Sequence, residues 1–357
     1  MSRGGPLQPR RSHARLGSMS GRFLGYWLLA AALVIGGCAA PPPRIPEPEA
    51  PPPRDSVVLG RDRDFAVVIA QPGDTFAALA QRYIGDADKA WWIAEFNNVD
   101  QIQPGQEIVI PLRPYNLTGI YANGYQTITI LCYHRFGPNR SAMTLVPATF
   151  EAQMEYLARN GYRVITMRQL ASFLAGKEPL PKKTVVITID DGYRATYQVA
   201  FPVLKKHGFP ATVYLYSDFV GASDALTWQQ MQEMVKSGLI DIQPHSKTHP
   251  NLTLKLSAES DAKYLDRMRR EVDAPITSIL DHLGLKSFSY AYPYGDVTET
   301  IVDMLAKQGV QLGVTVTSGG NAFYSYPYML RRTMIFGNDD METFKSKLVT
   351  FVRAPLK

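Results

Sequence analysis

The fold is decided by the stretch Val185-Val186-Ile187-Thr188-Ile189-Asp190-Asp191-Gly192-Tyr193, in which five apolar or β-branched residues run directly into two carboxylates. A short apolar run that ends in a turn is typical of a strand buried on both faces. Two adjacent carboxylates at its end are costly to desolvate unless a proton or a positive group lies between them. The pair could also simply cap a turn. This stretch alone therefore does not distinguish a structural turn from a catalytic site.

Similar strands are expected on both sides of this stretch. Apolar runs predict strands at 127–133, 211–215 and 240–242, and helical spacing predicts helices between or after them, such as 147–160, 197–207 and 341–351. Alternation of strands and helices is typical of parallel β/α units, and there are enough of them here to close a barrel. In such barrels the chemistry gathers at the C-terminal ends of the strands.

Two histidines, His245 and His249, follow the predicted strand at 240–242. Histidines at positions i and i+4 on one turn can both ligate a single metal ion. Together with the carboxylate pair at another strand end, they predict a metal site rather than two unrelated side chains.

The motifs IDDGY (189–193), HSKTH (245–249) and AYPYGD (291–296), in this order, resemble those of the NodB-type polysaccharide deacetylases. The resemblance extends over roughly residues 126–348, and we place the domain at 126–357. It implies a distorted (β/α) barrel and a metal-dependent enzyme that removes acetyl groups from glycans.

The resemblance also implies roles for single residues. It implies three metal ligands, with Zn²⁺ as the default ion: Asp191, His245 and His249. Asp190 would be the general base that takes a proton from the attacking water. The backbone N–H of Tyr294, in the turn that Pro293 begins, would stabilise the oxyanion.

The sequence departs from the commonest family pattern in two places. Residues 287–294 contain no arginine to orient the base, so Arg331 or Arg332 could supply that charge. No histidine follows His282 to act as the general acid. The early motif YHRF (133–136) instead resembles a subgroup that deacetylates poly-N-acetylglucosamine, which makes His134 the acid candidate. His134 could alternatively fix a loop at the strand end.

Residues 65–114 form a separate unit in the order strand, helix, helix, strand. Its motifs GDTFAALAQRY (73–83), FNN (96–98) and IQPGQEIVIP (102–111) resemble a LysM module. The resemblance implies a shallow groove for glycans that contain N-acetylglucosamine. We expect at least one of Trp91 and Trp92 to lie in the core of this small βααβ domain.

The N-terminal segment has the pattern of an export signal. An apolar run of 15 residues, 23–37, is shorter than the roughly 20 residues that span a membrane, and it ends at Cys38. Residues 35–38 resemble the lipobox of bacterial lipoproteins, which implies a signal peptide at 1–37 and lipidation of Cys38. An uncleaved anchor is the alternative, and Met19 is an alternative start.

The residue after the cysteine, Ala39, favours the outer membrane, facing the periplasm. Residues 38–64 are predicted to be a proline-rich tether, because eight prolines in the 13 residues 41–53 favour an extended chain.

The charge of the chain does not point to nucleic acid. Of 38 basic residues, five lie in residues 1–37 without an acid, which leaves 33 basic and 32 acidic residues in the remainder. An electrostatic interface for nucleic acid is therefore not indicated.

Taken together, these patterns predict a lipid-anchored, metal-dependent hydrolase that removes N-acetyl groups from poly-N-acetylglucosamine or peptidoglycan. The alternative is a non-catalytic, peptidoglycan-binding lipoprotein with a relic barrel. It stays open because the expected arginine and late histidine are missing.

Overall fold

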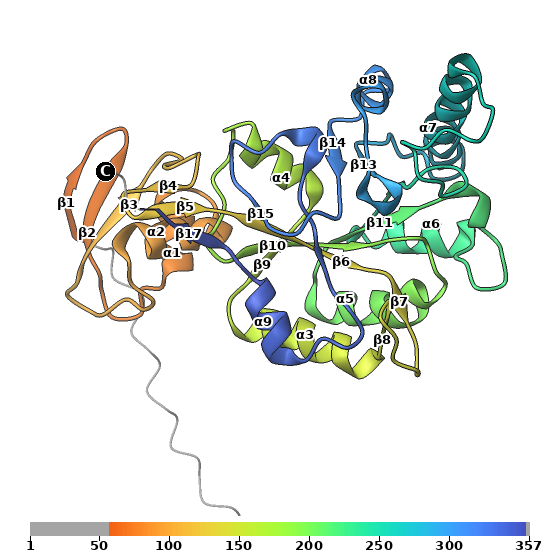
Figure 1. Ribbon diagram of the computed structural model, residues 1–357. Coiled ribbons are helices and arrows are strands. Elements are labelled where there is room, and N and C mark those ends of the chain that lie inside the picture. Colours follow the sequence, from red (N-terminus) through yellow and green to blue (C-terminus); the bar gives the residue numbers. More distant parts are fainter. Residues whose placement is uncertain (1–56, 355–357) are drawn as a thin grey trace, which may run out of the picture. The chain divides into compact units, whose positions relative to one another are not determined.

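The computed structural model describes residues 57–354, beginning with a small module (Figure 1). Its elements are β1 (Val57–Arg61), β2 (Phe65–Ile69), α1 (Phe76–Tyr83), η1 (Ala87–Lys89), α2 (Ala90–Asn97) and β3 (Glu107–Pro111). The strands form an antiparallel sheet in the order β1-β2-β3. The predicted order strand, helix, helix, strand is present, but β1 adds a strand inside the stretch predicted as tether.

The module has a core of its own, which α1 and α2 close over the sheet. Leu79 of α1 and Ile93 of α2 are fully buried against Val68 of β2 and Ile108 of β3. Thr75 caps the start of α1, because its hydroxyl accepts a hydrogen bond from the Ala78 N–H. Trp92 is buried and Trp91 is half-buried, so one of the two tryptophans is a core residue.

Four parallel strands form the centre of the second part of the chain, in the order β12-β11-β10-β6. They are β6 (Ile128–Tyr133), β10 (Thr184–Ile189), β11 (Ala211–Leu215) and β12 (Ile240–Pro244). Ile189 pairs with both Tyr133 and Val213, and Leu215 pairs with Pro244. Since the pairs at the strand ends are in register, the residues that follow each strand meet at one edge of the sheet.

Further short strands extend this sheet or lie outside it. β9 (Arg163–Ile165) pairs with β10, while β15 (Gly320–Asn321) and β16 (Thr333–Met334) pair with β6. β13 (Ser289–Ala291) and β14 (Leu312–Val314) pair with each other as a separate two-stranded sheet. Peripheral pairs are formed by β4 (Ile120–Tyr121), β5 (Gly124–Gln126), β7 (Arg135–Phe136), β8 (Thr144–Leu145) and β17 (Phe351–Arg353).

The predicted closed barrel is not confirmed, because the ladders among residues 57–354 leave a seam between β12 and β13. The side chain of Gln243 bridges this seam: its Oε1 accepts the N–H groups of Phe288 at 2.8 Å and Ser289 at 3.0 Å. On the other side of β14, one isolated bridge joins Val314 to Leu330. The predicted closed barrel requires a continuous ladder of backbone hydrogen bonds between neighbouring strands. At these two places a side chain and an isolated bridge join the strands instead.

Helices cover the sheet, and they match the predicted positions with two differences. The α-helices are α3 (Pro147–Arg159), α4 (Met167–Leu174), α5 (Phe201–His207), α6 (Trp228–Lys236), α7 (Asp261–Leu283), α8 (Glu299–Lys307) and α9 (Met341–Lys347). Short helical turns are η2 (Thr196–Ala200), η3 (Ser217–Phe219), η4 (Pro293–Gly295) and η5 (Pro327–Met329). The helix predicted at 197–207 is thus divided between η2 and α5. The helix predicted at 341–351 ends at Lys347, because the chain turns into β17, which pairs with β5.

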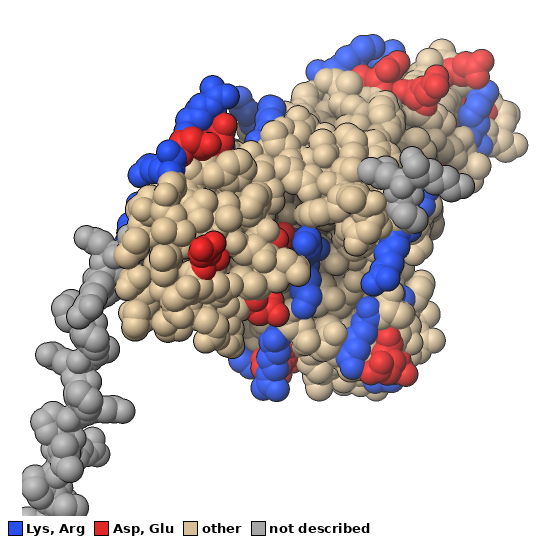
Figure 2. Space-filling model, turned by 90° about the vertical axis from the view of Figure 1, so that its left-hand side faces the viewer, with Lys and Arg blue, Asp and Glu red and all other residues tan. Residues whose placement is uncertain are grey.

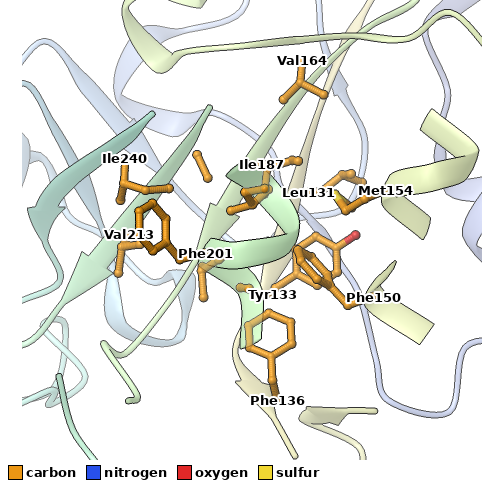
Figure 3. Packing of buried hydrophobic residues seen from close by; sticks show 14 of the residues in the cluster. Leu131, Tyr133, Phe136, Phe150, Met154, Val164, Ile187, Phe201, Val213 and Ile240 are labelled. Atoms are coloured by element: carbon orange, nitrogen blue, oxygen red, sulfur yellow. The ribbon is translucent and has the colours of Figure 1, made fainter. Parts of the chain in front are cut away.

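The apolar strands are buried on both faces, which explains their uninterrupted apolar sequence. Leu131, Ile187 and Val213 point to one core, where they pack with Phe150 of α3 and Phe201 of α5 (Figure 3). Their sequence neighbours Ile130, Val186 and Tyr214 point to a second core on the opposite face.

The surface carries mixed charges, and Figure 2 shows basic and acidic side chains near one another over the face it displays. Within residues 57–354, none of the helices is both long and apolar enough to cross a lipid bilayer.

Candidate metal and catalytic site

The two carboxylates after β10 enter different surroundings because the chain turns sharply between them. Asp190 is 1% exposed and continues the strand, and its N–H donates to the carbonyl of Tyr133. Asp191 has a φ of 72° and Gly192 a φ of 78°. The left-handed backbone at Asp191 therefore directs two neighbouring carboxylates to two different sets of partners.

Asp190 is held by Arg332, one of the two arginines proposed to orient the base. Two guanidinium nitrogens donate to the two carboxylate oxygens at 2.6 and 2.7 Å, and Nε donates to the carbonyl of Thr315 at 2.9 Å. Arg332 is fully buried. Arg331, in contrast, has an exposed side chain, and its backbone N–H donates to Asn321.

This ion pair determines the ionisation of Asp190. Burial alone would raise the pKa of Asp190, but the charge of Arg332, assisted by His245 and by the two hydrogen bonds, holds it well below its usual range. Asp190 is therefore a carboxylate at neutral pH, as a proton acceptor must be.

Asp191, His245 and His249 bring three ligand atoms together. The two Nε2 atoms are 3.2 Å apart, and Oδ1 of Asp191 lies 3.7 Å from that of His245 and 3.5 Å from that of His249. Ligands about 2.0–2.2 Å from a tetrahedral ion are separated by roughly 3.3–3.6 Å, so these spacings fit one small divalent cation.

The protonation states of His245 and Asp191 also suit a bound cation. The Nδ1–H of His245 donates to the carbonyl of Ala291 at 2.7 Å, which leaves Nε2 free to ligate. Burial lowers the pKa of His245 to about 3, so its imidazole is neutral. Burial raises the pKa of Asp191 to about 6, so this carboxylate gains much from a nearby cation.

His134 lies on the other side of Asp190, after β6. Its Nε2 is 4.0 Å from Oδ2 of Asp190, and its side chain is 12% exposed. Burial lowers its pKa, an effect that the charges of Asp190 and Asp191 partly offset. Its Nδ1 is buried and has no hydrogen-bond partner among the residues that the structure describes.

The turn at Pro293 and Tyr294 lies beside the histidines. Pro293 is buried, whereas the Tyr294 side chain is 61% exposed and its ring centroid lies 5.0 Å from that of His249. Tyr294 has a φ of 63°, so this backbone too is left-handed.

Two further neighbours of the site were not predicted. Sγ of Cys132 lies 3.5 Å from Oδ2 of Asp190 and completes a second close group with His134. The ring centroid of Tyr216 lies 5.3 Å from that of His249, and this ring stacks at 5.0 Å on Phe219. Their one sequence signal is position, because Cys132 is the last residue but one of β6 and Tyr216 directly follows β11.

Comparison with known proteins gives the family. The polysaccharide deacetylase family profile matches residues 177–313, and the LysM domain profile matches residues 68–111. YxkH of Bacillus subtilis, named as a polysaccharide deacetylase, is 30% identical over 209 residues, which are 58% of this chain and 71% of that protein. This chain therefore belongs to the polysaccharide deacetylases, which are hydrolases, and it carries a LysM domain.

Two poly-beta-1,6-N-acetyl-D-glucosamine N-deacetylases are also similar. That of Staphylococcus epidermidis is 29% identical, over 54% of this chain and 68% of the relative. That of Escherichia coli is 23% identical, over 64% of this chain but only 39% of the relative, so the match spans about two fifths of that enzyme.

Solved structures agree with this family. IcaB from Ammonifex degensii has a TM-score of 0.57 and 29% identity, covering 63% of this chain and 98% of that one. The Streptococcus pyogenes deacetylase PplD, in complex with acetate, has a TM-score of 0.56 and 26% identity, covering 63% and 99%.

Proposed function

We propose that this protein is a metal-dependent N-deacetylase of a polysaccharide that contains N-acetylglucosamine. The observation that carries the proposal is the contact of Asp190 with Arg332 immediately beside the cluster of Asp191, His245 and His249. A relic barrel would have no need of an ionised, buried carboxylate next to three converging ligand atoms.

Asp191, His245 and His249 would hold the ion. Two imidazoles and one carboxylate are a ligand set found at catalytic zinc, so Zn²⁺ is the ion we propose first. When bound, such an ion supplies Lewis acidity, which lowers the pKa of water from 15.7 toward about 7 and polarises the acetyl carbonyl.

The proton transfers are assigned to the residues around this cluster. Asp190, kept ionised by Arg332, accepts the proton of the attacking water. His134 donates a proton to the leaving sugar amine, and the carboxylate of Asp190, whose Oδ2 lies 4.0 Å from its Nε2, favours the protonated form that this step requires. The backbone N–H of Tyr294 is the donor that we propose for the oxyanion.

The glycan and the location of the protein are parts of the same proposal. Poly-N-acetylglucosamine is favoured by the similarity to two poly-beta-1,6-N-acetyl-D-glucosamine N-deacetylases and by the YHRF motif. The LysM domain favours contact with peptidoglycan. Lipidation of Cys38, which lies outside the described residues, would keep the enzyme in the cell envelope, facing the periplasm at the outer membrane.

Metal content and acetate release, measured on the same preparations, test this proposal. The wild-type protein should bind about one divalent ion per chain and release acetate from poly-N-acetylglucosamine or peptidoglycan, but not from acetylxylan. His245→Ala should lose metal and acetate release together, because two remaining ligands hold zinc poorly. Metal-free wild-type protein with full activity, or a His245→Ala variant with unchanged metal content, would contradict the proposal.

A further inference from the structure

The loop that carries His249 has an unusual backbone. Ser246 has a φ of 75° and His249 a φ of 62°, and neither residue is a glycine. Left-handed backbone is unfavourable for such residues and persists only where the surrounding structure enforces it. One enforcing contact is internal, because the His249 N–H donates to Oγ of Ser246 at 2.9 Å.

A second enforcing contact comes from Glu271, which lies on α7 and is 5% exposed. Its Oε2 accepts the N–H groups of Lys247 at 2.9 Å and Thr248 at 2.8 Å, and its Oε1 accepts the hydroxyl of Thr248 at 2.8 Å. One buried carboxylate thus binds the two residues between Ser246 and His249 by three hydrogen bonds.

The opposite side of the loop is held by η3. The N–H of Ser217 donates to the carbonyl of Ser246 at 3.2 Å, and the N–H of Asp218 donates to that of Lys247 at 3.0 Å. The loop is therefore fixed between η3 and α7, and the direction in which His249 leaves it depends on both contacts.

We propose that Glu271 is a positioning residue that holds His249 in the ligand geometry and so raises the affinity of the site for a divalent cation. The inference rests on the metal site proposed above. Glu271 acts as a charged acceptor for two N–H donors and one hydroxyl. A glutamine could keep these contacts, with its NH2 donating to the hydroxyl, but only as weaker bonds of a neutral amide. Its negative charge, buried near the cluster, also favours a cation there.

Metal affinity tests this proposal. Purified full chains would compete with a chromophoric chelator for Zn²⁺. Glu271→Gln removes the negative charge and leaves only the weaker bonds of a neutral amide, so it should weaken Zn²⁺ binding about 10- to 100-fold, the usual effect of mutating a group that orients a ligand. Asp281→Asn removes an acid from the exposed surface of the same helix, and it should bind Zn²⁺ like the wild type.

Two variants of Thr248 extend the test to proteins with Glu271 intact. Thr248→Val removes the hydroxyl bond to Oε1 but keeps both N–H bonds, so it should weaken binding less than Glu271→Gln does. Thr248→Ser restores the hydroxyl and should recover most of that loss. If Glu271→Gln does not fold, this pair provides the measurement.

The outcomes separate this inference from the proposed function. A wild-type protein that binds no Zn²⁺ would contradict the metal site itself. A wild type that binds Zn²⁺, with Glu271→Gln and Thr248→Val binding equally tightly, would overturn only the role of Glu271. If metal-free Glu271→Gln melts at a lower temperature than the wild type but binds Zn²⁺ with unchanged affinity, Glu271 supports only the fold and not the metal site.

Discussion

At the scale of single residues, Asp190 and Asp191 are neighbours in sequence with opposite electrostatic surroundings. Arg332 outweighs burial at Asp190 and keeps its pKa low, while burial dominates at Asp191 and raises its pKa to about 6. Groups whose surroundings separate their pKa values in this way can take different roles in one reaction. The proposed division into a base and a ligand follows from this difference.

Arg332→Met should show the effect of this ion pair on stability. Removing one partner of a buried pair costs about 3–5 kcal/mol, and we expect that loss at pH 7 in metal-free protein. Without the guanidinium of Arg332, burial raises the pKa of Asp190 above its ordinary value of 3.8. A carboxyl group whose pKa is higher in the folded state than in the unfolded state destabilises the fold at high pH, and this destabilisation decreases as the pH falls. The stability that Arg332→Met loses relative to the wild type should therefore be smaller at pH 4.5 than at pH 7.

Urea unfolding at the two pH values measures this difference. The double variant Arg332→Met/Asp190→Asn is the control, because it leaves neither charge unpaired and should regain part of the stability. A deficit that stays constant between pH 7 and pH 4.5 would show that Asp190 does not respond to Arg332.

His134→Ala tests the general acid. The variant should keep its metal and lose about 10²- to 10⁴-fold in turnover of the N-acetyl substrate. The loss should be smaller for an activated acetyl ester, whose leaving group needs little protonation. Asp190→Asn should depress both reactions, because both need an activated water. Near-normal turnover of the N-acetyl substrate by His134→Ala would leave this histidine a structural role.

At the scale of elements, long apolar strands were predictable and the connections between them were not. The strands at 128–133 and 184–189 are uninterrupted apolar runs, and the sequence locates them within one residue. The seam at Gln243 depends on a polar side chain that replaces backbone pairing, for which no local pattern exists. Arg331 and Arg332 could not be distinguished either, because only the packing of β16 shows which of the two points to Asp190.

Glu271 lies beyond sequence reasoning for a related reason. It is separated from Thr248 by 23 residues, within a helix of mixed charges whose pattern predicts only an amphipathic element. The proposed metal ligands were accessible because Asp191 follows one strand end, and His245 and His249 lie on a single turn after another.

The turn Pro293–Gly295 allows a prediction about backbone conformation. Tyr294 and Tyr326 are both largely exposed, at 61% and 56%, but their φ values are 63° and −68°. A glycine relieves the left-handed backbone only at 294, whereas at 326 it adds conformational freedom to the unfolded chain. Tyr294→Gly should therefore be more stable than Tyr326→Gly by about 1–2 kcal/mol in urea unfolding. Equal stabilities would mean that the turn is not strained.

At the scale of the whole molecule, the chain joins two domains with separate cores, each matched by its own family profile. This organisation was predictable, because each domain has its own motifs in order. The proposed lipid anchor belongs to the same scale, since it determines which glycan the enzyme meets.

Cys38→Ser tests the anchor in cells that express the full chain. Wild-type protein should incorporate labelled palmitate, and Cys38→Ser should not. Cys132→Ser is the matched control, because the chain has two cysteines and Cys132 is buried in β6. Equal labelling of the wild type and Cys38→Ser would rule out lipidation at this cysteine.

The seam between β12 and β13 has a consequence for how the protein opens. Where a side chain replaces a ladder, β13 and β14 can detach as a cooperative unit at a lower free energy than global unfolding requires. Their amide hydrogens should therefore exchange with deuterium faster than those of β10. Because Ala291 of β13 anchors His245, such an opening would release an ion bound at the proposed site from a chain that is otherwise folded. Metal exchange would then have its own kinetics, set by the motion of one small sheet.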